Sequence, residues 1–262
     1  MEKAAPSVKI LKAELNKIRD DALLIGFFKD RLSLSPELKK LDNAIGEVVI
    51  SCIRNSGFKG DKGEFRSIFV NKGIKNIVIA GLGEEQKYSL DILSNAIADA
   101  SKRLRGNGTE SFSIYLDSFK NKFKDEEAAE KAALGSLMGL YQFTEFKTKD
   151  RDKIRHIRQI TLITNSDKNF DKERRYASIV ADAVNRTRDL VNTPPNIATP
   201  EFVANYAKGL ARKSGLKCAV FGEKQIGKMK MGCFIGVAQG SANKPRLVVL
   251  EYNGSNKKPI VI

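Results

Sequence analysis

The sequence predicts an α/β protein in which a mostly parallel sheet is covered by helices. Short runs rich in β-branched residues alternate along the first half with segments whose apolar residues recur every three or four positions. Several of these runs are apolar almost throughout, as strands buried on both faces are. The chain has 262 residues, 42% of them hydrophobic, which is enough for two domains with cores of their own.

The first half alternates strands and helices. The expected strands are Ala22–Phe28, Glu47–Arg54, Ser67–Val70, Asn76–Ala80, Ser111–Leu116 and Gln159–Thr164. A helix is expected over Ser89–Arg105, with Ser89 as its N-cap and Gly106 as its terminator. A second helix is expected over Lys124–Tyr141, where the acids Asp125, Glu126 and Glu127 complement the helix dipole in the first turn.

The second half begins with two helices separated by a proline-rich turn. Residues 173–191 carry Tyr176, Ile179, Val180, Ala183, Val184 and Leu190 at helical spacing, which predicts a helix with one buried face. Pro194 and Pro195 end that helix, because neither has an N–H to donate. Thr199 and Pro200 then give the N-cap and first position of a helix running to about Lys213. We expect strands at Lys217–Phe221, Arg246–Tyr252 and in the closing KKPIVI, with a Gly- and Lys-rich loop after the first.

The net charge of +15 favours contact with polyanions. Basic residues are densest in FKTKDRDKIRHIR at 146–158, where Asp150 and Asp152 interrupt them and aromatics are few. We interpret this stretch as a solvated interdomain segment, and the alternative is a polyanion-contacting surface. Its candidate contact residues are Lys147, Lys149, Arg151, Lys153 and Arg155.

The expected location is the cytoplasm. No run approaches the ~18–20 apolar residues of a membrane span, and MEKAAPSVKI lacks the apolar core of a signal peptide. Cys52, Cys218 and Cys233 are odd in number and widely spaced, which suits a reducing compartment and matches no zinc motif. We expect all three to be small core residues.

No catalytic group of residues is evident. IAGLGEEQ at 79–86 lacks the third glycine of a dinucleotide fingerprint, and its glutamates would repel a pyrophosphate, so we interpret it as a tight strand-to-helix turn. His156, the single histidine, lies among basic residues, which argues against a Ser/His/Asp or Cys/His system. Gly232, Gly236 and Gly240 are expected in tight turns or close backbone packing.

Three blocks of sequence identify a family resemblance. ALGSLMGLYQFTEFK at 133–147, RDLVNTPPNIATPEFVANYAK at 188–208 and MGCFIGVAQGSANKPRLVVLEYNG at 231–254 together resemble the leucyl (cytosol) aminopeptidase family. Before residue 75 the resemblance is weaker and is carried by GFKGDKGEF at 57–65. It implies a mixed-sheet N-terminal domain similar to the macro-domain fold at 1–165, a linker helix at 166–192, and the start of an incomplete second α/β domain, the catalytic one, at 193–262.

The resemblance also implies a function. Enzymes of this family typically form hexamers, hold two divalent metals such as manganese or zinc, and remove N-terminal residues, leucine among them, from peptides. Their first catalytic lysine and their Asp and Glu metal ligands lie beyond the strand that corresponds to Lys258–Ile262. No catalytic or metal-binding residue can therefore be assigned in this chain, its substrate-binding residues are unknown, and we expect the chain alone to be inactive.

Two alternatives remain open. The first is a non-catalytic module that binds DNA or assembles with itself, because the chain is strongly basic and some bacterial members of the family also bind DNA. The second is a macro-domain-like pocket for a nucleotide. Both predict binding in place of catalysis.

Overall fold

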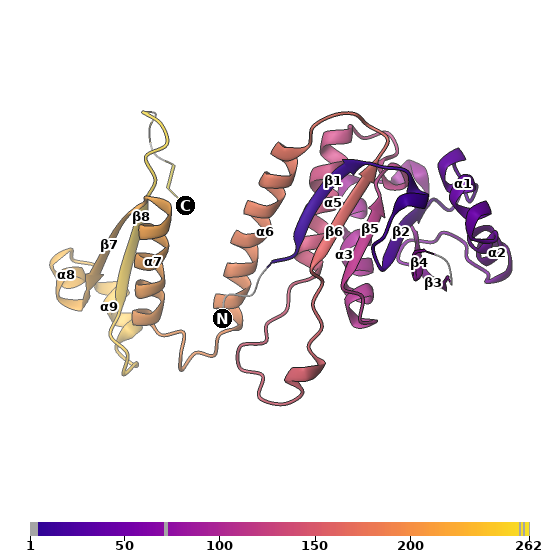
Figure 1. Cartoon of the computed structure of the whole chain (residues 1–262). Coiled ribbons are helices and arrows are strands. Elements are labelled where there is room, and N and C mark those ends of the chain that lie inside the picture. The colour runs from indigo at the N-terminus through magenta and orange to yellow at the C-terminus, as the bar shows by residue number, and fades with distance from the viewer. Residues whose placement is uncertain (1–4, 71–72, 257, 259, 262) are drawn as a thin grey trace. The chain divides into compact units, whose positions relative to one another are not determined.

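The structure is a computed structural model that describes residues 5–70, 73–256, 258, 260 and 261. Contacts divide the chain into two units, residues 1–186 and 187–262. Figure 1 labels the elements of both units. In the described part of the chain, no helix combines the length and apolar character needed to cross a bilayer.

The first unit is built around a six-stranded sheet, counted over the described residues. Its strand order is β1-β6-β5-β2-β4-β3, and only β3 runs antiparallel to its neighbour. The strands are β1 Ser7–Lys12, β2 Ala22–Phe27, β3 Phe65–Phe69, β4 Asn76–Gly81, β5 Ser111–Tyr115 and β6 Gln159–Thr164. The predicted α/β class, with a mainly parallel sheet flanked by helices, is confirmed.

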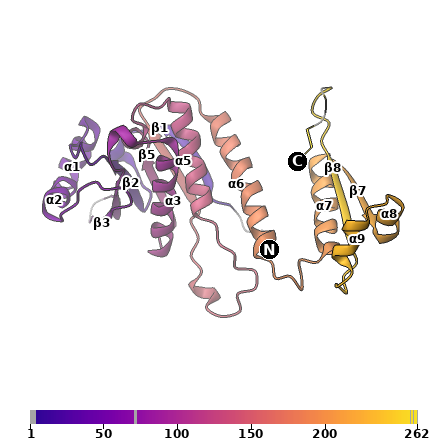
Figure 2. The ribbon, with the colours of Figure 1, turned by 180° about the vertical axis from the view of Figure 1, so that it is seen from behind.

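Helices cover both faces of this sheet. The described helices of the first unit are α1 Pro36–Ile45, α2 Val48–Asn55, α3 Leu90–Gly106, α4 Asp117–Lys120, α5 Asp125–Gly139 and the part of α6 (Asp171–Asn192) up to residue 186, with short 3-10 turns at Leu15–Lys17, Glu85–Lys87 and Arg151–Lys153. Leu24 and Val78 pack with residues of α3, α5 and α6 on one face, and Figure 2 shows this side. Leu23 and Ile77 pack with α1 and α2 on the other. The central strands are thus buried on both faces, and each buried Leu or Ile stabilises the fold by about 1.5–3 kcal/mol.

The second unit is smaller. Strands β7 Lys217–Gly222 and β8 Arg246–Glu251 pair antiparallel, and α7 Pro200–Ser214 contacts both of them. The short helices α8 Glu223–Lys228 and α9 Gly232–Ala238 lie in the segment between the two strands. Arg246 fixes β8 to the first turn of α7, because its Nε donates to Glu201 Oε2 at 2.7 Å.

Several predicted elements are confirmed with their caps. Ser89 Oγ accepts from the N–H of Ile92 at 3.3 Å at the start of α3, and α3 ends at Gly106. Thr199 Oγ1 accepts from the N–H of Phe202 at 3.3 Å, and Pro200 begins α7. These ends lie where the sequence predicts them because capping is local chemistry.

The strand expected at Glu47–Arg54 is wrong, because these residues form helix α2. The carboxylate of Asp42, itself buried, accepts from the N–H groups of Val49 at 2.7 Å and Ile50 at 3.1 Å. This satisfies two of the free donors at the helix N-terminus, and Val49 and Ile53 then face the core one turn apart. Helix α1 and strand β1 are additions that the sequence did not predict.

The second half also departs from expectation. The loop expected after β7 contains α8 and α9, so Gly232 and Gly236 lie in a helix and Gly240 follows it. Of the strand expected at KKPIVI, residues 257, 259 and 262 lie outside the described residues, and 258, 260 and 261 are not in a strand. Cys233 is exposed, and Cys52 and Cys218 are half-buried, so the expectation of three core cysteines is wrong.

Helix α6 extends slightly beyond the predicted 173–191, but its buried residues are different ones. Ala177 and Ala181 are buried, whereas Tyr176 is 53% and Ile179 is 69% exposed. Small residues allow the helix to lie close to the core of the first unit, and larger apolar side chains are left on its outer side.

Candidate functional site

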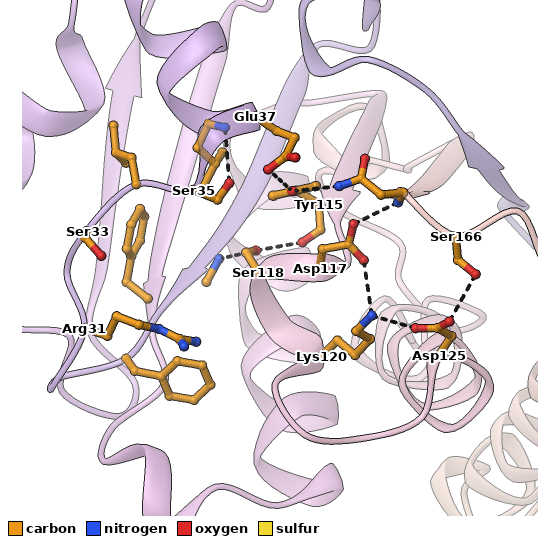
Figure 3. A pocket seen from close by; sticks show the side chains of 16 residues that line it. Arg31, Ser33, Ser35, Glu37, Tyr115, Asp117, Ser118, Lys120, Asp125 and Ser166 are labelled. Atoms are coloured by element: carbon orange, nitrogen blue, oxygen red, sulfur yellow. Dashed lines mark hydrogen bonds and ion pairs between the residues drawn. The ribbon is translucent and has the colours of Figure 1, made fainter.

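A pocket of about 660 Å³ lies at the carboxyl ends of β2 and β5, beside the residues that follow β6 (Figure 3). Ligands of parallel α/β sheets characteristically bind at this edge, because the loops that follow the strands converge there. The pocket is lined by residues far apart in sequence: Gly26, Phe27 and Phe28 at the end of β2, then Arg31, Ser33, Leu34, Ser35, Glu37, Leu38, Tyr115, Asp117, Ser118, Lys120, Asp125, Asn165 and Ser166. It is the candidate functional site of the described first unit.

Asp117 and Ser118 fix the floor of the pocket. The carboxylate of Asp117 accepts from the hydroxyl of Thr164 at 2.9 Å and from the N–H of Asn165 at 2.8 Å. Ser118 Oγ accepts from the N–H of Gly26 at 2.9 Å and donates to the carbonyl of Tyr115 at 2.7 Å. These bonds connect the ends of three strands, so the pocket has a rigid base.

One wall is a closed ionic network. Lys120 Nζ lies 2.6 Å from Asp125 Oδ1, and Ser166 donates to Asp125 Oδ2 at 3.0 Å. Lys168 Nζ is 3.5 Å from the same carboxylate. The hydrogen bond from Lys120 is the main reason that the pKa of Asp125 lies below its usual value. The charges of Lys120 and Asp125 therefore largely neutralise each other.

The opposite side carries Arg31 and Glu37. The guanidinium of Arg31 lies 5.4 Å from the centre of the Phe28 ring, and its Nη1 is 3.4 Å from Glu85 Oε1. Glu37, in the first turn of α1, accepts from the hydroxyl of Tyr115 at 3.3 Å. Figure 3 shows Arg31 and Glu37 at separate parts of the rim.

Protonation in this region follows from the hydrogen bonds. The pKa of Glu37 is lowered, first by the hydrogen bond from its own backbone N–H, with further bonds from Ser35 and Tyr115. Burial raises the pKa of Tyr115 to about 12. Near neutral pH the pocket therefore presents an ionised Glu37 and a neutral phenol that donates a hydrogen bond to it.

Phe27, Leu34 and Leu38 add an apolar surface to the pocket, and each is at most 9% exposed. The lining contains several hydroxyls and no histidine, and His156 is exposed in the 146–158 segment. No serine in the pocket is thus paired with an imidazole base. The lining therefore combines charged groups, hydroxyls and an apolar surface, as small-molecule sites commonly do.

The candidate polyanion contacts are not part of this pocket. Lys147, Lys149, Arg151, Lys153 and Arg155 are all exposed on one segment that contains the 3-10 turn Arg151–Lys153. Lys153 Nζ lies 2.8 Å from Asp150 Oδ1. Their role in contacting a polyanion stays a prediction.

The glycines of IAGLGEEQ have a structural role. A Cβ on Gly81 would collide with the carbonyl oxygen of Asp61, and Gly83, with φ of +77°, donates from its N–H to the carbonyl of Gly60 at 2.9 Å. The GFKGDKGEF segment therefore packs directly against the end of β4 and the turn that follows it. The interpretation as a tight turn agrees with this geometry.

The acids expected at the start of α5 also act locally. Glu127 Oε2 accepts from the N–H of Lys124 at 3.2 Å, and Glu126 lies 2.9 Å from Lys168 Nζ. Over the residues that the structure describes, no group of three or more His, Cys, Asp or Glu side chains is arranged to hold a metal ion.

Comparisons with known proteins match both halves of the chain. The N-terminal domain model of the cytosol aminopeptidase family matches residues 24–150, and the catalytic domain model of the same family matches residues 185–262. The chain belongs to the cytosol aminopeptidase family. The resemblance found in the three sequence blocks is thereby confirmed.

Similar proteins agree with this assignment. Probable cytosol aminopeptidases of Sulfurihydrogenibium sp. and Wolbachia pipientis wMel are 31% and 30% identical over 96% and 98% of this chain. That of Alkaliphilus metalliredigens is 28% identical over 95%. The chain covers 51%, 50% and 50% of the first three such relatives, so it spans about half of their length.

Solved structures show the same fold. A mutant of tomato leucine aminopeptidase superposes with a TM-score of 0.87 at 21% identity, over 98% of this chain and 53% of that one. The bottromycin maturation enzyme BotP in complex with Mn superposes with a TM-score of 0.72 at 20% identity, over 89% of this chain and 45% of that one. At these identities the likeness concerns the fold alone.

Most of the pocket lies inside the N-terminal domain match, and the sequence analysis did not identify it. Two local signals were available: the Ser35-Pro36-Glu37 helix start, and polar residues directly after the buried strands. Neither signal shows that the end of β2, the start of α1 and Asn165 meet at one point, because that depends on strand order.

Proposed function

We propose that this chain forms the N-terminal domain and the first part of the catalytic domain of a leucyl-aminopeptidase-like enzyme. The complete enzyme is a metal-dependent exopeptidase that releases N-terminal residues such as leucine from peptides in the cytoplasm. The supporting observation is that the two domain models of one family match in the expected order. The metal is manganese or zinc, and the bottromycin enzyme in complex with Mn is consistent with the former. The assembly is a hexamer, by analogy with the family.

The 262-residue chain alone is inactive in this proposal. Two cations about 3.5–4 Å apart require several carboxylates to hold them and activate a water. In the family these ligands and the first catalytic lysine follow the strand corresponding to Lys258–Ile262. The residues of this chain contribute scaffold to the reaction.

The Asn-Thr-Pro-Pro-Asn turn is one such contribution. Thr193 Oγ1 donates to the carbonyl of Asp189 at 2.7 Å, and the N–H groups of Ile197 and Ala198 both donate to the carbonyl of Pro194, at 2.9 and 2.8 Å. These bonds and the fixed φ of the prolines make the turn stiff, and Thr199 starts α7 directly after it. The turn thus fixes where the first helix of the catalytic domain begins.

The test is hydrolysis of leucine p-nitroanilide by the purified chain with Mn²⁺ or Zn²⁺. We expect no release above the buffer rate, and turnover by the chain alone would overturn the assignment of inactivity. The exopeptidase proposal is tested by reading the DNA that follows the codon for Ile262. An in-frame or frameshifted Lys-Gly-x-Thr-Phe-Asp segment supports it, and downstream DNA that encodes no such segment contradicts it.

A second candidate function is a non-catalytic module that binds DNA or assembles with itself. The observation that favours it is the exposure of five basic side chains on the 146–158 segment of a chain with net charge +15. Phosphate contacts by such residues attract nucleic acid without reading its sequence.

A further inference from the structure

Strand β3 forms one edge of the six-stranded sheet. It lies at the end of the strand order opposite to β1, and Figure 1 shows the two strands on opposite sides of the sheet. Over the residues that the structure describes, β3 pairs with β4 alone. Its outer side therefore presents backbone N–H and C=O groups, which can pair with a strand of another molecule.

The ladder with β4 shows which backbone groups of β3 face outward. The carbonyl of Glu64 accepts from the N–H of Gly81 at 2.8 Å, and the N–H of Val70 donates to the carbonyl of Lys75 at 3.0 Å. In an antiparallel pair, residues that bond to the neighbouring strand alternate with residues whose backbone faces away from it. The even-numbered residues thus bond to β4, and the odd-numbered residues face the open edge. The outward-facing residues are Phe65, Ser67 and Phe69.

This edge has little of the protection that natural edge strands carry. The strand FRSIF contains no lysine, which would charge the edge, and no proline, which would remove a donor. Arg66 Nη1 donates to the carbonyl of Phe65 at 3.0 Å and covers that one acceptor. The outward N–H and C=O groups of Ser67 and Phe69 have no partner among the described residues. The Phe69 side chain is also 78% exposed.

We propose that β3 pairs antiparallel with β3 of a second copy of this chain, about a two-fold axis at Ser67. In this register Ser67 lies opposite Ser67 of the second copy, and Phe65 lies opposite its Phe69. Each of these pairs exchanges two hydrogen bonds, because all three residues direct their backbone groups outward in both strands. The contact is isologous, since the same five residues form both halves of it.

The side chains of β3 are compatible with this register. Phe65 and Phe69 lie on the same face of the strand, so each Phe69 would be covered by Phe65 of the other copy. The Phe65 ring already carries the guanidinium of Arg103, 4.6 Å from its centre. On the opposite face, Arg66 would lie beside Ile68 of the other copy. No two like charges of β3 are therefore placed directly opposite each other.

The expected association is weak and reversible. One short strand from each copy buries less than the roughly 1,200 Å² of a stable interface, which is the range of transient contacts. Two chains with net charge +15 also repel each other until salt screens them. This pairing gives the self-assembly alternative a specific interface. Its failure would leave the peptidase and DNA-binding proposals to their own tests.

Analytical ultracentrifugation of the 262-residue chain in about 0.15 M NaCl tests the proposal, because the Debye length is then about 8 Å. We expect the weight-average mass to rise from 29.0 kDa toward twice that value as the concentration approaches about 1 mM. Ser67→Pro removes an outward N–H and leaves the β4 ladder intact, so it should stay monomeric. Ser67→Ala keeps this N–H and should associate like the wild type. A wild type that stays monomeric, or a Ser67→Pro variant that associates equally, overturns the proposal.

A second variant covers the case in which Ser67→Pro does not fold, as far-UV circular dichroism would show. Phe69→Lys changes only an exposed side chain, and it should weaken the association about tenfold, because it removes both aromatic cross-strand pairs and adds charge at the edge. Unchanged association of a folded Phe69→Lys variant would show that the chains meet elsewhere.

Disulfide trapping tests the register itself. Cα atoms of a bonded antiparallel pair lie about 5.5 Å apart, within the range of about 4.4–6.8 Å that a disulfide spans. With the exposed Cys233 replaced by Ser, Ser67→Cys should form a linked dimer under oxidised glutathione at least about tenfold faster than Ser51→Cys, on the exposed side of α2. Equal rates for the two variants would overturn the two-fold axis at Ser67.

Discussion

Asp21 and Ser111 are joined by two reciprocal hydrogen bonds. The N–H of Asp21 donates to Ser111 Oγ, and the N–H of Ser111 donates to Asp21 Oδ2, both at 3.2 Å. On its other side Asp21 accepts from Lys75 Nζ at 2.7 Å, and its carbonyl accepts from the N–H groups of Lys75 and Asn76. This one residue therefore aligns the starts of β2, β4 and β5, whose opposite ends form the pocket.

Replacing Asp21 with Asn should destabilise the first unit by about 1–3 kcal/mol at neutral pH, because charge-assisted hydrogen bonds are removed. The hydrogen bond from Lys75 is the main cause that lowers the pKa of Asp21 from its ordinary value of 3.8. A carboxylate with a depressed folded-state pKa stabilises the fold above its unfolded pKa, and the effect disappears as pH falls through the folded value. In urea unfolding, the difference in the free energy of unfolding between wild type and variant should therefore decrease below pH 3.8.

The matched control is Asp99→Asn on the exposed face of α3, which should change the free energy of unfolding by less than about 0.5 kcal/mol. If the difference in the free energy of unfolding between wild type and Asp21→Asn stayed constant from neutral pH to below pH 3.8, the stabilisation would not come from the charge of Asp21.

Gly135 and Gly139 let α5 approach α3 closely. A Cβ on Gly135 would overlap the carbonyl oxygen of Ser94, and one on Gly139 would overlap that of Ala98. Gly→Ala in a helix interior normally stabilises by about 1 kcal/mol, but here overpacking should reverse the sign and destabilise by about 1–3 kcal/mol. Thermal unfolding of Gly135→Ala measures this.

Gly209 in α7 provides the opposite case, because no atom lies within 4 Å of its added Cβ. Gly209→Ala should slow amide exchange in α7 by up to about fivefold, in line with the same propensity difference. A higher Tm for Gly135→Ala would contradict the prediction for that residue, because α3 and α5 would then have to move apart without a cost in free energy.

Local chemistry explains which elements were predictable. Strands β2 and β4 are buried along their whole length, so their apolar runs identify them from sequence. The starts of α3 and α7 were equally clear, since Ser89 and Thr199 cap the helices that they begin. At these two helix starts the capping contact lies within three residues along the chain.

The elements that were wrongly predicted or missed are those whose structure depends on contacts outside the local sequence. Val48–Asn55 has a strand-like composition, yet it is helical because Asp42 caps it and the core accepts Val49 and Ile53. Strand β1 escaped prediction because only Val8 is buried in it. The pocket depends on strand order, which brings Asn165 beside Tyr115, and no local pattern encodes that.

In the second unit, Arg246 and Glu201 should show a small coupling energy. Their 2.7 Å contact is partly exposed, at 26% and 52% of the two side chains, and water weakens the attraction. We expect a double-mutant cycle with Arg246→Met and Glu201→Gln to give about 0.5–1 kcal/mol. The measurement is urea unfolding at low and at 1 M salt, where the coupling should fall. A coupling that is insensitive to salt would contradict a screened ion pair.

The 146–158 segment makes a prediction for the second candidate function. If it contacts DNA, replacing Lys147, Lys149, Arg151, Lys153 and Arg155 with Gln should weaken duplex binding for any sequence, because phosphates are the same throughout. The slope of log K against log salt should fall by about 0.9 for each phosphate that the variant no longer neutralises, as measured by fluorescence anisotropy. The control variant replaces five other exposed basic residues with Gln, so that the two variants have the same net charge. These residues are Lys39, Lys40, Arg54, Lys102 and Lys224. Equal slopes in the two variants would show that overall charge, and not this segment, attracts the DNA.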